Sequence, residues 1–135
     1  MTVAAANRIL SAAVAAINAA LPAVPVFRSR PIAFQREDLP AIVILPDTDD
    51  SKRFSARQIT VSLHFEVRFY LRGDDWETTV APLDQAVHQA LTISRAMESC
   101  TSEVTRTGTR WITDNADGTA GELIVRYTAI YDEAG

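Results

Sequence analysis

Two polar residues of one predicted strand have the types and spacing that acid-base chemistry requires. His64 and Glu66 are two residues apart where polar and apolar residues alternate, so both side chains project from the same face of a strand. An imidazole beside a carboxylate can exchange a proton near neutral pH. The sequence shows no nucleophile-base pair elsewhere that could complete a catalytic site. We therefore expect His64 and Glu66 to make an ordinary cross-strand contact at the surface.

Carboxylates gather in two further segments. Asp47, Asp49 and Asp50 offer the hard oxygen ligands that magnesium or calcium prefers, and Asp114 and Asp117 offer a weaker set. The first group lacks the spaced carboxylates and closing glutamate of a helix-loop-helix calcium site, so we expect a solvated loop, no resident metal and no cofactor. If an ion such as magnesium does bind, we expect it to offset charge repulsion where subunits meet and so to assist oligomerisation.

The remaining reactive side chains suggest no further chemistry. Cys100 is the only cysteine, which excludes an intramolecular disulfide and a cysteine-based zinc cluster, so we expect a free structural thiol. His88 lies beside the apolar stripe of a predicted helix, and we expect it at the edge of the core. The five glycines are scattered and form no phosphate-binding loop. The sequence therefore predicts a protein that is not an enzyme.

Two helices are expected to position these residues. Thr2 can cap a helix over residues 3–20, where apolar residues recur at helical spacing. This segment is rich in alanine, which favours close packing on a sheet, with contact to another subunit as the alternative. Arg8 interrupts it where a signal peptide would be apolar, and we judge it too polar to cross a bilayer, so no membrane partner is expected. A second helix is expected over residues 82–95, with Pro82 in its first turn.

The sheet is expected to be built around one long strand. Polar and apolar residues alternate strictly from Arg57 to Leu71, which predicts a strand of about 45 Å with one buried face. Such a strand is longer than a small domain needs, so one end is expected to project or to pair with a neighbour. The other predicted segments are strands at 24–28, 41–45, 104–113 and 122–132, an extended connection at 30–40, a polar loop at 46–56 and a turn at 114–119.

Length and composition fit this arrangement. A chain of 135 residues is expected to form a single domain over 1–135, and 47% hydrophobic residues supply a core. The net charge of −4, with basic and acidic residues interspersed, argues against a nucleic-acid partner. We therefore predict an α+β fold: one mixed, mostly antiparallel sheet with two helices packed on one face.

Three short motifs occur in the order found in one known family. They are the segments Arg30-Pro31-Ile32-Ala33-Phe34, Asp38-Leu39-Pro40-Ala41 and His64-Phe65-Glu66-Val67. In this order the chain resembles the phage tail terminator family, to which the minor tail protein U of lambda belongs. Pairing of Arg30 with Asp38 and burial of Phe34 would give the first motif a role in the fold alone.

The resemblance implies a structural virion protein. Its subunits would form a homo-hexameric ring that caps the tail tube, ends tail polymerisation and presents the head-tail joining surface. Its partners would be other copies of the chain, the major tail tube protein and a head-tail joining protein. It would be assembled in the bacterial host cytoplasm and reside in the virion tail. The residues expected to contact partners lie in the two polar segments: Asp47, Asp49, Asp50, Lys52, Arg53, Phe54, Asp114 and Asp117.

Two alternatives remain open at this point. Another neck protein of the head-tail junction would share the ring and have a different neighbour. A small oligomeric enzyme would need a pocket built across subunits from His64, Glu66 or Tyr127.

Overall fold

The computed structural model describes residues 2–29, 40–53, 55–114 and 120–134, with the side chains of Asp114 and Ala134 left out. Five strands form one sheet in the order β1-β2-β3-β5-β4. Only β1 and β2 run parallel, and the other neighbours are antiparallel. The predicted α+β class with one mixed, mostly antiparallel sheet is therefore confirmed. The strand bounds are β1 Val26–Arg28, β2 Ala41–Arg53, β3 Gln58–Arg72, β4 Glu103–Asp114 and β5 Ala120–Ala134.

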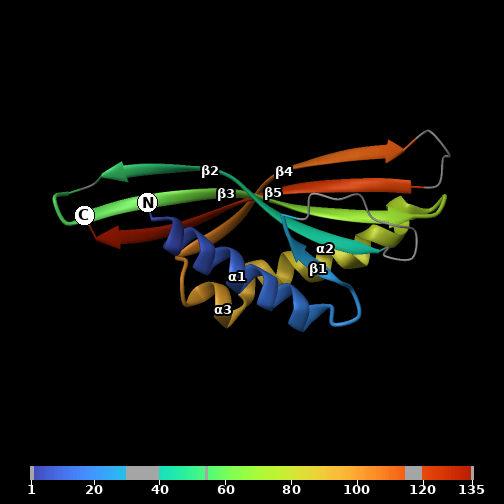
Figure 1. Ribbon diagram of the computed structural model, residues 1–135, viewed down its shortest axis with the longest axis horizontal. Helices are drawn as coiled ribbons and strands as arrows, with labels where there is room; N and C mark the ends of the chain where they lie inside the picture. Colours follow the sequence, from blue (N-terminus) through green and yellow to red (C-terminus); the bar gives the residue numbers. More distant parts are fainter. Residues whose placement is uncertain (1, 30–39, 54, 115–119, 135) are drawn as a thin grey trace.

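The helices form a second layer on one face of the sheet, and no helix of the described residues covers the opposite face (Figure 1). They are α1 Val3–Ala20, α2 Trp76–Ile93 and the single turn α3 Arg95–Glu98. Alternate residues of β3 point into the space between the layers, as the sequence pattern predicts. The core residues from β3 are Val61, Leu63, Phe65, Val67, Phe69 and Leu71.

Helix α1 begins as its sequence predicts. The Thr2 hydroxyl accepts a hydrogen bond from the Ala5 amide at 3.2 Å. Ala13 and Ile17 are fully buried against the sheet, so part of the alanine-rich face packs within the subunit. With a mean hydropathy of 1.4, α1 is long and apolar enough to cross a membrane by composition alone, so the sequence-based judgement that it is too polar was wrong. A mostly buried core helix of a soluble protein and an N-terminal signal sequence meet the same criterion, and here a third of the helix is buried inside the fold.

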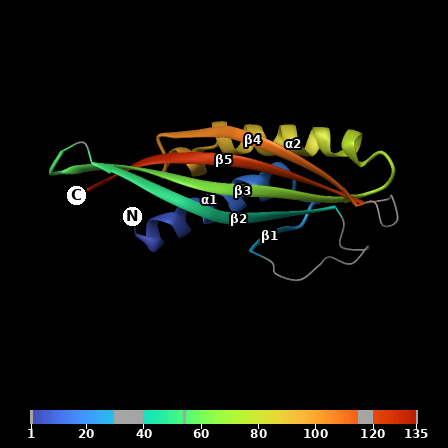
Figure 2. The ribbon, with the colours of Figure 1, turned by 90° about the horizontal axis from the view of Figure 1, so that it is seen from above.

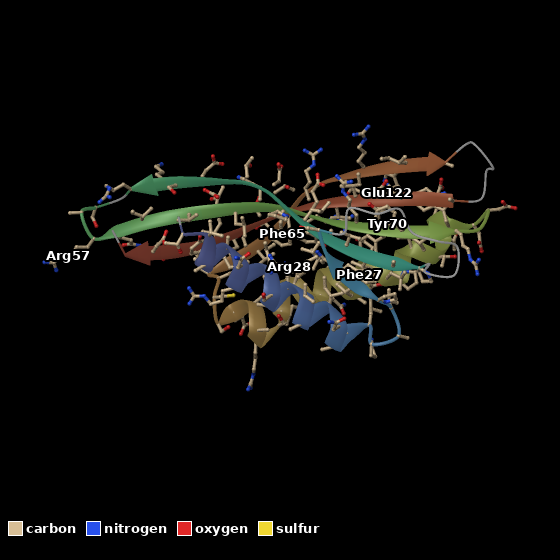
Figure 3. All side chains as sticks on the ribbon, in the orientation of Figure 1. Phe27, Arg28, Arg57, Phe65, Tyr70 and Glu122 are labelled. Carbon is tan, nitrogen blue, oxygen red and sulfur yellow. The ribbon has the colours of Figure 1, made fainter. Side chains whose placement is uncertain are left out.

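Polar residues of α1 tie the helix to the sheet. Arg28 of β1 donates hydrogen bonds to Asn7 Oδ1 at 3.0 Å and to Ser11 Oγ at 3.4 Å (Figure 3). Strand β1 begins at Val26, two residues later than expected.

The segment predicted to be a polar loop, 46–56, is mostly strand. Strand β2 continues to Arg53, and its register with β3 shifts once, between Pro46 and Asp49. A bulge of this kind lets a strand continue past a residue such as proline that has no N–H to donate. The loop prediction was wrong because it relied on the polar composition of the segment. The backbone of β3 supplies hydrogen-bond partners along the segment and so holds it as a strand.

Helix α2 begins at Trp76, six residues before its predicted start, and Pro82 lies inside it. The amides of Thr78 and Thr79 donate to the Asp75 carbonyl at 2.9 and 3.1 Å, which closes the first turn. Trp76 is 2% exposed, and its burial favours an early start. The expectation that Pro82 marks the first turn was therefore wrong.

Gly121 of β5 permits this burial. Its position faces the Trp76 indole, and a Cβ there would overlap the ring. Before the helix, Gly73 adopts a φ of 107°, a backbone conformation that favours glycine.

Candidate assembly surface

The distal half of β2 and the start of β3 form an arm that extends past the helix layer (Figure 2). We define the arm as residues 46–53 and 58–63. All of its β2 side chains are exposed, and β5 continues alongside β3 as far as the pair Gln58–Ala134. Arg57 lies at the tip (Figure 3). The predicted projection of one end of the long strand is thus present as a hairpin.

A polar clasp fixes the arm to the sheet. His64 lies between two strands, with its Nε2 2.9 Å from Asp50 Oδ2 and its Nδ1 2.9 Å from Thr128 Oγ1. Closer to the tip, Thr60 donates to Asp132 Oδ1 at 2.9 Å. These contacts join β2, β3 and β5, so the arm is held in one orientation relative to the core.

The turn at the tip is held by Arg53. Its Nη1 donates to the carbonyls of Ser55 and Ala56 at 3.4 and 3.3 Å. The guanidinium predicted to contact a partner thus braces its own hairpin. Lys52 is exposed on β2. Phe54 and Asp117 lie outside the described residues, as do the side chain of Asp114 and the predicted contact between Arg30 and Asp38.

The three arm aspartates do not share one site. Successive side chains of a strand point to opposite faces, and Asp50 points to the helix-free face, where it meets His64. Asp49 opposes Leu63, on the helix side. Asp47 and Asp49 are exposed and form no ion pair with any described residue. Within the described part of the chain, no three His, Cys, Asp or Glu residues are grouped to hold a metal ion.

A charged cluster that sequence reasoning missed lies at the centre of the helix-free face. Arg68 donates two hydrogen bonds to Glu66 Oε1, at 2.8 and 3.0 Å, and one to Glu122 Oε1 at 3.5 Å. Its backbone neighbours in the register are Val43 and Ile124, both buried. Burial lowers the pKa of Arg68, but hydrogen bonds from its guanidinium to Glu66 and Tyr70 outweigh this and raise it. The Glu-x-Arg spacing within one strand face was the available signal.

Tyr70 lies beside Glu122 of this cluster (Figure 3). Burial, followed by the charge of Glu122, raises the pKa of the Tyr70 phenol. The phenol therefore stays neutral at physiological pH, and the cluster presents one cation between two carboxylates. Because these charges pair closely with one another, the cluster is better suited to stabilising the sheet than to binding a charged ligand.

The residues considered for an enzyme site do not converge. His64 is engaged by Asp50 and Thr128, while Glu66 is engaged by Arg68. Tyr127 points to the other side of the sheet, into the core, where its ring stacks on Phe65 at 5.8 Å.

Burial raises the pKa of Tyr127 to about 12, and the charge of Asp84 adds to the effect. Its hydroxyl has no hydrogen-bond partner of good geometry among the described residues, although the ion pair between Arg106 and Asp84 lies close enough to affect its pKa. His88 lies at the core boundary, as expected, with its ring 6.2 Å from that of Tyr127.

Two hollows open near the arm. The larger, about 330 Å³, lies between α1, α3 and the end of β5 and includes Arg8, Cys100 and Tyr131. Burial raises the pKa of the Cys100 thiol, which makes it a poor nucleophile at neutral pH and fits a structural role. The smaller, about 220 Å³, lies between the first turns of α1 and the bulge of β2.

The outer strand β4 is a second surface that the sequence did not single out. It pairs with β5 alone, and none of its described side chains from Glu103 to Thr113 is buried. Trp111 is 56% exposed, and its ring lies 5.9 Å from that of Trp76.

Comparison with models of known protein families gives no match, and a search of curated proteins finds no similar sequence.

Proposed function

We propose that this chain is a tail-terminator-like subunit: a structural virion protein that assembles as a ring of six copies, as the family resemblance implies, and caps a phage tail tube. The proposal rests on the resemblance of its ordered motifs to the tail terminator family. In this role it ends tail polymerisation and presents a joining surface to the head. Other copies, the major tail tube protein and a head-tail joining protein are its proposed partners.

The observation that carries the proposal is the arm. The β2 half of the arm, residues 46–53, has only exposed side chains and adds nothing to the core of its own subunit. The His64 clasp and the Arg53 bonds nevertheless hold it in a defined orientation. Ordered polar projections on a rigid sheet are typical of surfaces that recognise another protein.

The sheet also suits a ring. Residues 45–53 of β2 have no partner on their outer side among the described strands, because β1 pairs only with residues 42–44. On the opposite edge, β4 pairs with no described strand other than β5. A subunit with different surfaces on opposite edges can repeat head to tail, and such contacts close into a ring when the rotation between subunits allows it.

The first test is the mass of the protein in solution, measured by light scattering after size exclusion over a concentration series with and without millimolar magnesium. We expect a hexamer, or a shift toward one with magnesium. The second test adds the protein to polymerising tail tube protein and measures tube length by electron microscopy. Tubes of shortened, capped length are expected, and unchanged tubes together with a monomeric mass would refute the proposal.

A His64→Ala variant separates this proposal from the enzyme alternative. The substitution removes the clasp and should weaken capping, and no turnover is expected in either protein. A turnover that the unmodified protein shows and the His64→Ala variant loses, without capping by either protein, would favour the enzyme alternative.

A further inference from the structure

The two outer edges of the sheet have backbone groups that lack a partner among the described strands. β4 forms one edge, and residues 45–53 of β2 form part of the other (Figure 2). The β2 edge becomes available beyond Ile44, because β1 pairs with residues 42–44 and the Ser29 amide donates to the Ile44 carbonyl at 3.0 Å. Unpaired N–H and C=O groups along a strand are a template for pairing with another chain.

Alternate residues of β2 direct these groups outward. Ile42 donates to the Pro25 carbonyl and Ile44 accepts from Ser29, so both residues point to the outer side. The alternation of an antiparallel ladder, followed through the pairing with β3, continues this pattern along the arm. The outward groups of the arm therefore belong to Pro46, Asp49, Ser51 and Arg53. Pro46 has no N–H, so it can only accept there.

The outward residues of β4 follow from the same alternation. The Ile130 carbonyl accepts from the Ser102 amide at 2.7 Å, so Ile130 directs its backbone groups toward β4. The other even-numbered residues of β5 do the same and engage their partners on β4. The β4 residues between those partners keep their backbone groups outward, and they are Val104, Arg106, Thr109, Trp111 and Thr113.

We propose that β4 of one copy pairs antiparallel with residues 46–53 of β2 in the next copy. The occupant of each edge is a second copy of this chain, and the proposal deepens the ring function above and rests on it. β4 and β2 run antiparallel within the subunit, so one sheet continues from copy to copy and the helices stay on the same side. The outward residues then pair as Trp111 with Pro46, Thr109 with Asp49, Arg106 with Ser51 and Val104 with Arg53.

Charges on the helix-free face favour this register, which places Gly108 opposite Asp50. Arg126 of β5 is the partner of Gly108, and its Nε lies 4.0 Å from the position of a Gly108 Cβ, so its side chain runs over the glycine toward the outer edge. Arg126 is exposed and forms no ion pair with any described residue. The Asp50 carboxylate is 77% exposed and is oriented by His64. Arg126 of one copy therefore meets Asp50 of the next.

Apolar side chains match on both faces in the same register. On the helix-free face, the half-buried Ile112 lies opposite the half-buried Leu45. On the helix face, Trp111, which is 56% exposed, lies opposite the exposed Pro46. Opposite residues of a continuous sheet share a face, so each pair is in contact range.

The adjacent registers fit less well. A slip of two residues toward the tip of the arm sets Arg126 against Lys52, a like charge. A slip of two residues the other way brings Trp111 to Ile44, where Ser29 occupies the edge.

The register fixes the offset between copies. Within one subunit Ile112 is level with Ala41, so pairing with Leu45 displaces the next copy by four residues along β2, which is about 13 Å. The four strands β2, β3, β5 and β4 span about 19 Å. This offset corresponds to a strand tilt of about 35°, which lies in the range of closed barrels and so is compatible with a closed ring.

Cysteine cross-linking tests the pairing directly. In a Cys100→Ser background, Thr105→Cys and Lys52→Cys are introduced together, because the register sets them opposite each other on the helix-free face. Such residues have Cα atoms about 4.5–5.5 Å apart, within disulfide reach. Within one subunit three strand spacings, about 14 Å, keep the two positions apart. The matched control pairs Thr105→Cys with Ser51→Cys, one residue away and on the opposite face.

Mild oxidation should give a ladder of multimers for the first pair, and monomers for the control pair and each single variant. The reaction is run at concentrations where light scattering finds the assembly, or on capped tubes if the tube is needed as a template. An assembly without a ladder, or with equal ladders from both pairs, overturns the edge pairing and leaves the ring standing. Dimers from a single variant indicate a two-fold contact and also overturn it. Absence of any assembly, alone or on tubes, overturns both proposals.

A proline at Thr109 tests the backbone bonds. The Thr109 N–H points outward, so Thr109→Pro removes no bond to β5 but removes the donor to Asp49 of the next copy. The variant should keep the circular dichroism of the subunit and raise the concentration for half-assembly about tenfold or more. Thr109→Ala keeps the N–H and is the matched control, with an expected change below about twofold. Equal effects of the two variants would contradict the pairing.

Discussion

Replacing Gly121 by alanine should destabilise the fold, although glycine-to-alanine changes in ordinary backbone are often favourable. Gly121 has no positive φ, so alanine restricts the unfolded chain and would by itself stabilise the protein by about 0.4–1 kcal/mol. The added Cβ, however, overlaps the buried Trp76 ring. Overpacking of this kind costs about 1–3 kcal/mol, so the net effect is a loss of about 1–2 kcal/mol. At this chain length, that lowers the melting temperature by roughly 3–10 °C.

Urea unfolding followed by far-ultraviolet circular dichroism measures the loss. Gly108→Ala is the matched control, since the nearest atom to its Cβ would be Arg126 Nε at 4.0 Å, and little change is expected. A Trp76→Leu background removes the overlapping ring, so Gly121→Ala should become neutral or slightly stabilising there. The reasoning is refuted if the two glycine variants lose equal stability, or if the cost at Gly121 persists without the indole.

Three further outcomes are expected. The free energy of unfolding should fall by about 2–3 kcal/mol between pH 10 and 12 through Tyr127 alone: its phenol stays neutral in the fold to about pH 12, while the unfolded phenol ionises near 10. Tyr127→Phe should remove that part of the alkaline loss in urea titrations at pH 9 and 11.5, and an unchanged slope would show that another group is responsible. Arg106→Met should lower the free energy of unfolding by about 1–3 kcal/mol, because it leaves the half-buried Asp84 without its ion-pair partner. Adding Asp84→Asn should recover part of this loss, and a double-mutant cycle with strictly additive effects would show that the two residues do not interact. The amides of residues 47–53 should exchange rapidly with deuterium in the dilute subunit and slowly after assembly. Equal protection in both states would show that the arm is not part of the interface.

The sequence predicts those parts of the fold in which one local signal dominates. The Thr2 cap and the apolar spacing of α1 define its start and its end at Ala20. Strict alternation identifies β3 and the face that it buries. In both segments the burial of alternate or helically spaced residues is large enough to decide the local structure.

The prediction fails where a distant segment decides the local structure. Residues 46–53 are polar and include a proline, yet they pair along β3 after a bulge. The early start of α2 depends on Trp76 meeting Gly121, about forty-five residues later in the chain. The clasp likewise joins Asp50, His64 and Thr128 from three strands. Such contacts follow from tertiary register, which composition and periodicity do not encode.

The energetics of the arm bear on the proposed assembly. The conformational entropy lost on ordering one residue costs about 1–2 kcal/mol. A backbone hydrogen bond contributes a net stabilisation of about 0.5–1.5 kcal/mol, and a cross-strand side-chain pair contributes about 0.2–1 kcal/mol. Because every side chain of residues 46–53 is exposed, no burial within the subunit adds to this balance. Residues 46–53 are therefore close to marginal by themselves: besides their backbone pairing with β3, side-chain bonds hold them at the base, through His64, and at the tip, through Arg53. Burial against a neighbour, at about 25 cal/mol per Å² of apolar surface, would shift the balance decisively. The ring proposed above would supply that burial, because a neighbouring copy would cover the exposed strand.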